Sequence, residues 1–257
     1  MRRIWLLASG ERLNFTQDYF DFLCLDLSQY PISRAVAASS AVPGIFTPLT
    51  LNNHSGYCNY QQTQLTKKAD IAKKQGIISD WQRWVVEHKN ATKKPYLHLI
   101  DGGLSDNLGL RSLLDLRRIT SAQDTAAHNS HIKPKRVFIS VNAALGYDNS
   151  IDESANIPPL KRVISGSIDI AIDRFSEETA KQFSEALKNK QENVENYFIR
   201  LNLYDLSDSE LADRVNNIKT SFKISSQDIE DLLQAAEILL DKNEEFIRLK
   251  NDLNNGN

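Results

Sequence analysis

Asp101, followed directly by Gly102 and Gly103, is the position at which the sequence most clearly predicts chemistry. The aspartate ends an apolar run, Tyr96 to Ile100, that is typical of a buried strand. A carboxylate there must be hydrogen-bonded or functional, because burying an unpaired charge is costly. The two glycines lower the steric cost of positive φ and let a ligand or a second backbone come close. The alternative is an Asp-Gly turn that the aspartate caps with its own side chain.

The positions of the ten glycines exclude the common glycine-based motifs. No two glycines are two or five residues apart, which excludes a dinucleotide-binding fingerprint and a P-loop. None are four apart, so a Gly-x-Ser-x-Gly nucleophile elbow is also absent from these residues. The five histidines include no pair four apart, which excludes a His-Glu-x-x-His zinc site. We therefore expect no metal and no cofactor, and we expect His128 and His131 to be solvated.

Composition and charge argue against several other classes of function. The chain has 257 residues, with 31 lysines and arginines against 33 aspartates and glutamates, for a net charge of −2. Nucleic acid is not an expected partner, because this balance offers no large cationic surface. The apolar run 4–8 is shorter than the roughly seven residues that a signal peptide needs. No window approaches the roughly twenty apolar residues of a membrane-spanning helix.

The hydrophobic pattern predicts strands that alternate with helices. A hairpin is expected over 4–16, where the turn pair Ser9-Gly10 joins two short extended segments. Apolar runs predict strands over 96–100, 136–142 and 197–203. The predicted helices cover 33–42, 108–119 and 160–190. Two more open at Ser207, with Glu210 three residues later, and at Ser225, with Asp228; the last is a single helix whose apolar stripe runs to Leu253. Strands that are apolar on both faces predict an α/β fold with a mainly parallel sheet.

Two stretches differ from this alternating pattern. Residues 52–95 look like an insertion within the single domain 1–257, and residues 250–257 are an Asn-rich end that we expect to fray. The insertion carries Trp81 and Trp84 on one helix face, flanked by lysines. We expect these tryptophans to pack on the domain; the alternative is a helix that lies at a membrane surface.

Two blocks of the sequence resemble the patatin-like phospholipases. Asp101 to Gly109 is similar to the Asp-Gly-Gly/Ala block of that family, and residues 34–48 are similar to its Ala-Ser-rich helix that ends in proline. The blocks occur in the order of the family, and weaker matches lie at 15–17, 137–143 and 220–222. The resemblance spans most of the chain. It implies a patatin-like three-layer fold with a mainly parallel sheet, of which the N-terminal part of the domain is missing.

The resemblance also implies a chemistry. The family consists of lipid acyl hydrolases that use a Ser–Asp dyad, in which the aspartate takes the proton of the serine without a histidine. Asp101 inherits the role of that aspartate, and Gly102, Gly103 and Asn107 belong to the motif that shapes its site. A lipid or another ester is the implied substrate, and a membrane surface is a candidate contact.

The sequence departs from the family pattern, because the glycine-rich loop and the serine elbow are not found in these residues. We expect that the nucleophile is lost or supplied elsewhere, for example by an N-terminal segment in trans, and that this chain alone does not hydrolyse esters. The second hypothesis is a non-catalytic remnant that binds lipid or a partner protein. The third is an unrelated α/β domain that binds a small molecule.

The remaining reactive side chains are predicted to be structural. Cys24 and Cys58 are expected to be a buried thiol and a loop residue, with a bond between them as the alternative. We expect His98 to be a satisfied core histidine. The serines that we considered as substitute nucleophiles are expected to pack closely, to bond back to their own helix or to cap one: they are Ser39, Ser40, Ser105, Ser165 and Ser167.

Overall fold

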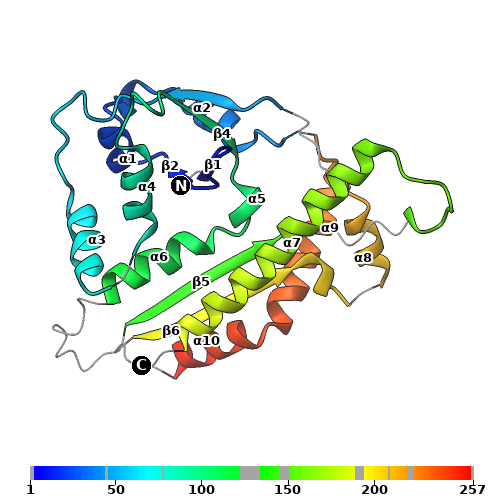
Figure 1. Cartoon of the computed structure of the whole chain (residues 1–257). Helices are drawn as coiled ribbons and strands as arrows, with labels where there is room; N and C mark the ends of the chain where they lie inside the picture. Colours follow the sequence, from blue (N-terminus) through cyan, green and yellow to red (C-terminus); the bar gives the residue numbers. More distant parts are fainter. Residues whose placement is uncertain are drawn as a thin grey trace. The chain divides into compact units, whose positions relative to one another are not determined.

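The computed structural model of the chain describes residues 3–43, 46–76, 78–121, 134–144, 151–188, 194–207, 209–218 and 223–255 (Figure 1). The chain divides into two compact units. The first comprises residues 1–127 together with 174–183, and the second comprises residues 128–173 and 184–257. Each unit is built around its own hydrophobic cluster.

The first unit contains a four-stranded antiparallel sheet in the order β2-β1-β4-β3. The predicted hairpin is confirmed, because β1 pairs with β2 around the turn at Gly10, where φ is +64°. The strands are β1 (Arg3–Leu6), β2 (Arg12–Asn14), β3 (Leu49–Asn52) and β4 (Tyr96–Asp101). The helices are α1 (Gln17–Phe22), the 3₁₀ turn η1 (Leu27–Gln29), α2 (Ile32–Ser39), α3 (Gln64–Lys74), α4 (Asp80–His88), α5 (Gly103–Asp106) and α6 (Leu110–Ser121).

The expected fold, a patatin-like three-layer arrangement with a mainly parallel sheet, is wrong. The apolar run over 96–100 predicts a strand buried on both faces, but in β4 Leu97 and Leu99 are buried while Tyr96 and His98 are exposed. This alternation is typical of an antiparallel strand with one covered face. β1 and β3 are the two neighbours of β4 in the sheet, and both run antiparallel to it. Short apolar runs could not reveal these partners.

The register of the sheet decides which side chains share a face. Leu6 lies opposite Leu99, and Ile4 lies opposite both Leu13 and Asp101. Residues that face each other in an antiparallel pair lie on the same side of the sheet. Trp5 lies opposite Arg12 and Ile100, on the other side. Asp101 therefore shares a face with Ile4, whereas Trp5 and Arg12 occupy the opposite one.

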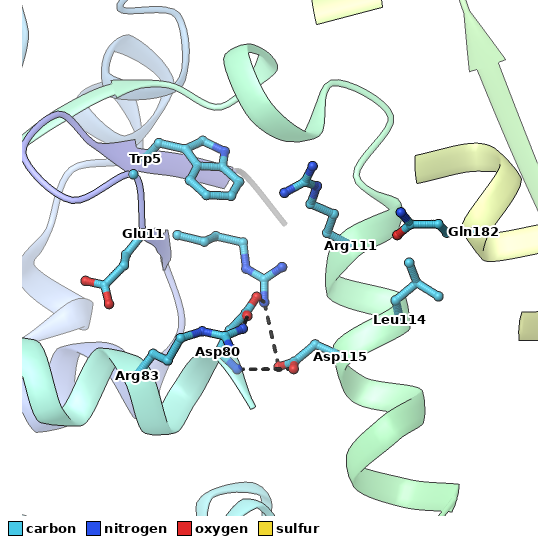
Figure 2. A pocket seen from close by; sticks show the side chains of 10 residues that line it. Trp5, Glu11, Asp80, Arg83, Arg111, Leu114, Asp115 and Gln182 are labelled. Atoms are coloured by element: carbon cyan, nitrogen blue, oxygen red, sulfur yellow. Dashed lines mark hydrogen bonds and ion pairs between the residues drawn. The ribbon is translucent and has the colours of Figure 1, made fainter. Parts of the chain in front are cut away.

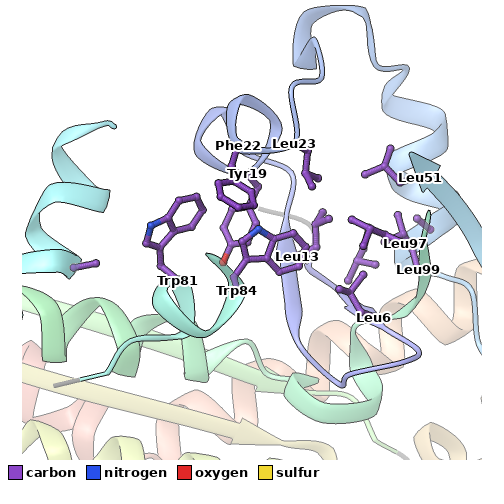
Figure 3. Packing of buried hydrophobic residues seen from close by; sticks show 13 residues of the cluster. Leu6, Leu13, Tyr19, Phe22, Leu23, Leu51, Trp81, Trp84, Leu97 and Leu99 are labelled. Atoms are coloured by element: carbon purple, nitrogen blue, oxygen red, sulfur yellow. The ribbon is translucent and has the colours of Figure 1, made fainter. Parts of the chain in front are cut away.

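The hydrophobic cluster of the first unit covers the face that carries Leu6 and Leu99 (Figure 3). Trp81 and Trp84 of α4 contribute to it, at 8% and 1% exposure, so the predicted packing of these tryptophans on the domain is confirmed. Both tryptophan rings lie edge-on to the Tyr19 ring, with centroids 5.0–5.1 Å apart. A membrane contact through these two side chains would require them to leave this core.

The second unit contains a two-stranded parallel sheet. β5 (Lys135–Asn142) pairs with β6 (Glu195–Asn202), and α7 (Leu160–Leu187) connects them, although residues 174–183 of α7 belong to the first unit. The parallel crossover is the part of the predicted sheet that is confirmed. β5 is less buried than its apolar sequence predicts, because Val137, Ile139 and Val141 are 42–64% exposed.

One face of β6 is covered by the helices at the end of the chain. Tyr197, Ile199 and Leu201 pack in the second hydrophobic cluster with residues of these helices. The elements are the 3₁₀ turn η4 (Leu203–Asp205), α8 (Ser209–Asn216), α9 (Ser226–Lys242) and α10 (Glu244–Asn254). The predicted capping box of Ser225 with Asp228 is confirmed.

The single final helix that the sequence predicts is interrupted at Asn243. Asn243 is extended, at φ −76° and ψ 115°, and its side chain accepts a hydrogen bond from the Phe246 amide. The same side chain donates to the Arg200 carbonyl of β6. The break lets α9 and α10 both pack on this unit while their apolar stripe continues, which is why periodicity alone did not reveal it. α10 then extends to Asn254.

Cys24 and Cys58 form a disulfide bond, with Cα atoms 5.7 Å apart. The expectation of two free cysteines is wrong. Cys24 lies two residues after the end of α1, at φ 56°. The loop 54–58 lies against the end of that helix. The His54 amide donates to the Leu23 carbonyl at 3.1 Å. Tertiary structure brings these two loops together, so the spacing of the cysteines in the sequence could not predict the bond.

We predict that loss of the disulfide destabilises the first unit. The bond closes a loop across a sequence separation of 34 residues, and cross-links of this size typically contribute about 2–4 kcal/mol. Urea unfolding with and without a reductant measures the difference. The double variant Cys24→Ser with Cys58→Ser should not respond to the reductant. Equal unfolding midpoints for the oxidised and reduced chain would contradict the prediction.

Candidate functional site

Asp101 is the last residue of β4, and helix α2 ends beside it. The Asp101 amide donates a hydrogen bond of 3.0 Å to the carbonyl of Ala41, two residues after the end of α2. Ala38 of α2 is fully buried in the same hydrophobic cluster as Leu99. Small side chains let this helix approach the strand closely. The structure thus brings the Ala-Ser-rich block and the Asp-Gly-Gly block together, although about sixty residues separate them in the sequence.

The carboxylate of Asp101 is half-buried and anchored at one oxygen. Oδ1 accepts a hydrogen bond of 2.6 Å from the Gly103 amide, whereas Oδ2 has no partner within the described ranges. Burial raises the pKa of this carboxyl above its ordinary value, and the Gly103 hydrogen bond acts in the opposite direction. The self-capped turn that the sequence left as an alternative is therefore present. It leaves the second oxygen available as an acceptor.

The glycine pair serves close approach, not positive φ. Gly102 has φ −71°, in the helical region, and its carbonyl accepts a hydrogen bond of 3.0 Å from Trp5 Nε1. A Cβ atom at Gly103 would lie 3.0 Å from Asp101 Oδ1 and 3.2 Å from Asn107 Oδ1. These distances are tighter than ordinary van der Waals contact. Because Gly103 has no side chain, the Asp101 carboxylate and the exposed Asn107 side chain can both approach the Gly103 backbone.

The other reactive residues are mostly structural, as predicted. Ser39 Oγ donates to the Val36 carbonyl, and Ser165 and Ser167 donate to carbonyls of the preceding turn of α7. His98 differs from the prediction, because it is exposed and lies 3.1 Å from Thr50 Oγ1 instead of in the core. His128, His131, the 220–222 block and the Ser105 side chain lie outside the described residues.

A cluster of charged residues around the buried Arg12 lies on the other face of the sheet, and the sequence did not predict it. It surrounds a cavity of about 400 Å³ in the first unit (Figure 2). β1 and β2 contribute Trp5 and Arg12, α4 contributes Asp80 and Arg83, and α6 contributes Arg111 and Asp115. The residues come from segments about a hundred positions apart, so no local motif could have revealed the cavity.

Arg12 is the centre of this cluster, and its side chain is 4% exposed. Its Nη2 lies 3.0 Å from Asp80 Oδ2 and 3.9 Å from Asp115 Oδ2. Asp80 also pairs with Arg83. Burial, together with the charge of Asp80, raises the pKa of Asp115. Two carboxylates thus face two guanidinium groups on this side of the cavity.

His88 and Glu11 form a second pair that the sequence did not predict. His88 Nε2 lies 2.7 Å from Glu11 Oε2, and the His88 side chain is 3% exposed. Burial lowers the pKa of His88, and the hydrogen bond with Glu11 opposes this shift. The pair links α4 to the hairpin turn, so its role is to hold the two elements together.

Comparison with known proteins gives no match: no family model, no curated protein and no solved structure resembles the chain. Within the described ranges, no group of three or more His, Cys, Asp or Glu residues could hold a metal ion. No helix among the described elements is long and apolar enough to cross a membrane.

We predict that Asp101→Asn gains stability relative to the unchanged chain as the pH rises. The folded state raises the Asp101 pKa, so folding favours the protonated carboxyl, and the unchanged chain loses this contribution as the pH rises from the unfolded to the folded pKa. An asparagine at 101 keeps an oxygen for the Gly103 amide but does not ionise.

Urea unfolding of both chains at acidic and at neutral pH measures this effect, since every other group titrates alike in the two. The free energy of unfolding of Asp101→Asn minus that of the unchanged chain should increase from acidic to neutral pH; a value that stays constant or decreases would contradict the assigned direction of the pKa shift.

Proposed function

We propose that this chain is the aspartate-bearing part of a patatin-like lipid acyl hydrolase, in which Asp101 is the base of a Ser–Asp dyad. The nucleophilic serine would lie in sequence outside these 257 residues, since they contain no Gly-x-Ser-x-Gly. The proposal rests on the two sequence blocks and on the surroundings of Asp101. It does not rest on the order of the strands.

The observation that carries the proposal is the hydrogen bond from the Asp101 amide to the Ala41 carbonyl. The resemblance was found in two separate blocks, and nothing in their sequences required them to meet. An accidental likeness in two unrelated segments would give no reason for the end of α2 to lie against the end of β4. Their contact supports a common site at Asp101.

The state of the carboxyl supports the role of a base. A general base must lie within hydrogen-bond reach of the proton that it takes, and its pKa should approach the working pH. Asp101 Oδ1 is held by the Gly103 amide, which fixes the orientation of the group, and Oδ2 is the oxygen that would accept the proton. Burial raises the pKa of Asp101, which makes the carboxylate a stronger base than an exposed aspartate.

The proposed reaction is acyl transfer through the serine. As the serine Oγ forms a bond to the ester carbon, its proton moves to Asp101 and the carbonyl electrons move to the oxygen. The tetrahedral intermediate then expels the alcohol, which takes the proton from Asp101. Water hydrolyses the acyl-serine by the same route and regenerates the dyad. The alcohol and the fatty acid are the products.

The test measures release of nitrophenol from a nitrophenyl ester and of fatty acid from phosphatidylcholine vesicles. The 257-residue chain is compared with the natural polypeptide, including any sequence that its reading frame encodes before residue 1. We expect hydrolysis by a longer polypeptide that carries the serine elbow, and none by the 257 residues alone. In the active form, Asp101→Asn should lower kcat by about 10²–10⁴-fold, the usual contribution of a general base.

Asp70→Asn is the matched control, because Asp70 lies on α3 away from Asp101, where it accepts a hydrogen bond from the Gln62 side chain. It should leave kcat unchanged. Hydrolysis that survives Asp101→Asn would overturn the role of Asp101. A longer polypeptide without any activity would instead favour the non-catalytic hypothesis.

A further inference from the structure

We infer that the cavity beside Trp5 and Arg111 binds an oxyanion, either phosphate or carboxylate, carried by a small molecule. This site lies on the face of the sheet opposite Asp101, as the pairing of Trp5 with Ile100 requires. The inference is independent of the function proposed for Asp101.

Arg111 forms no ion pair with a carboxylate among the residues that the structure describes. Its Nε donates to Thr179 Oγ1 at 3.4 Å, and its guanidinium carbon lies 5.8 Å from the centroid of the Phe175 ring. Within the described ranges its two terminal nitrogens have no partner. Thr179 contacts Nε and Phe175 faces the guanidinium plane, so these contacts position the group and leave its outer edge open to a ligand.

The acidic residues that line the cavity are paired with basic residues other than Arg111. Asp80 and Asp115 face Arg12, and Asp80 also pairs with Arg83. Glu11 pairs with His88, and its carboxylate points away from Arg111 in Figure 2. The three acidic residues that line the cavity within the described part of the chain thus each have another basic partner, and none of them is paired with the Arg111 guanidinium.

The shape and the lining of the cavity suit a small molecule that carries an oxyanion. Arg111 extends from α6 toward the indole of Trp5 (Figure 2), and Leu114 and Gln182 line the same cavity. A volume of about 400 Å³ is within the range of small-molecule pockets. A guanidinium presents its N–H groups as a planar fork that matches phosphate or carboxylate oxygens. Trp5 and Leu114 provide apolar surface for the rest of the ligand.

Arg12 completes the electrostatic environment. Its Nη2 faces the carboxylates of Asp80 and Asp115, whereas its buried Nε and Nη1 have no hydrogen-bond partner in the part of the chain that the structure describes. Asp80 and Asp115 balance the charges of Arg12 and Arg83, so the positive charge that attracts an anion into the cavity is that of Arg111.

The test is calorimetric titration of the chain with glycerol 3-phosphate, glycerate and glycerol. We expect the phosphate, the carboxylate or both to bind with one site, and glycerol not to bind. Arg111→Gln should weaken binding at least about tenfold, which corresponds to about 1.4 kcal/mol. Arg111→Met, which keeps an unbranched side chain but removes the guanidinium, should show the same loss. Circular dichroism checks that each variant folds.

The control is Arg117→Gln, a substitution of the same kind on α6 at a residue that does not line the cavity. It should bind as the unchanged chain does. Competition by phosphatidylglycerol vesicles, but not by phosphatidylcholine vesicles, would identify a lipid head group as the source of the oxyanion, and its absence would identify a soluble ligand. The inference is overturned if neither anion binds, if glycerol binds equally well, or if both Arg111 variants retain full affinity.

Discussion

The antiparallel pairing of β1 with β4 is the constraint on which both sites of the first unit depend. Ile4 lies opposite Asp101 and Trp5 lies opposite Ile100, across about a hundred residues of sequence. Because side chains alternate along a strand, this register directs Asp101 to the face that α2 covers and Trp5 to the face of the charged cavity. A shift of one residue would exchange the two faces and remove both sites. The hydrogen bond from Trp5 Nε1 to the Gly102 carbonyl holds the same register at the turn that follows β4.

Local features of this unit were predictable because neighbouring residues determine them. The hairpin at Gly10, the helix 33–42 and the strand that ends at Asp101 follow from turn residues, small side chains and apolar runs. The capping box at Ser225 is equally local. The direction of strand pairing is different in kind, because β4 would have the same sequence in a parallel or an antiparallel sheet. The partly exposed face of β4 and the exposed side chains of β5 were visible only once the neighbouring elements were placed.

The candidate site divides in the same way. Asp101 stood out because an ionisable residue at the end of an apolar run needs an explanation, and the structure supplies its anchoring by Gly103 and its contact with Ala41. Arg12, Asp80, Asp115 and Arg111 did not stand out, since each is an ordinary charge in its own segment. Their importance arises from the low exposure of Arg12 and from the pairing that leaves Arg111 without a carboxylate. Charge balance within a cavity cannot be read from spacing along the chain.

The account of Asp101 depends on a carboxyl that is harder to ionise than an exposed aspartate. Carbon-13 NMR titration of the Asp101 carboxyl, assigned by comparison with Asp101→Asn, measures this property without reference to stability or activity. The account predicts a titration midpoint above the ordinary aspartate value, because burial outweighs the single hydrogen bond from Gly103. A midpoint at or below that value would mean that the group is solvated or more strongly bound as an anion, and Asp101 would then have no support as a base.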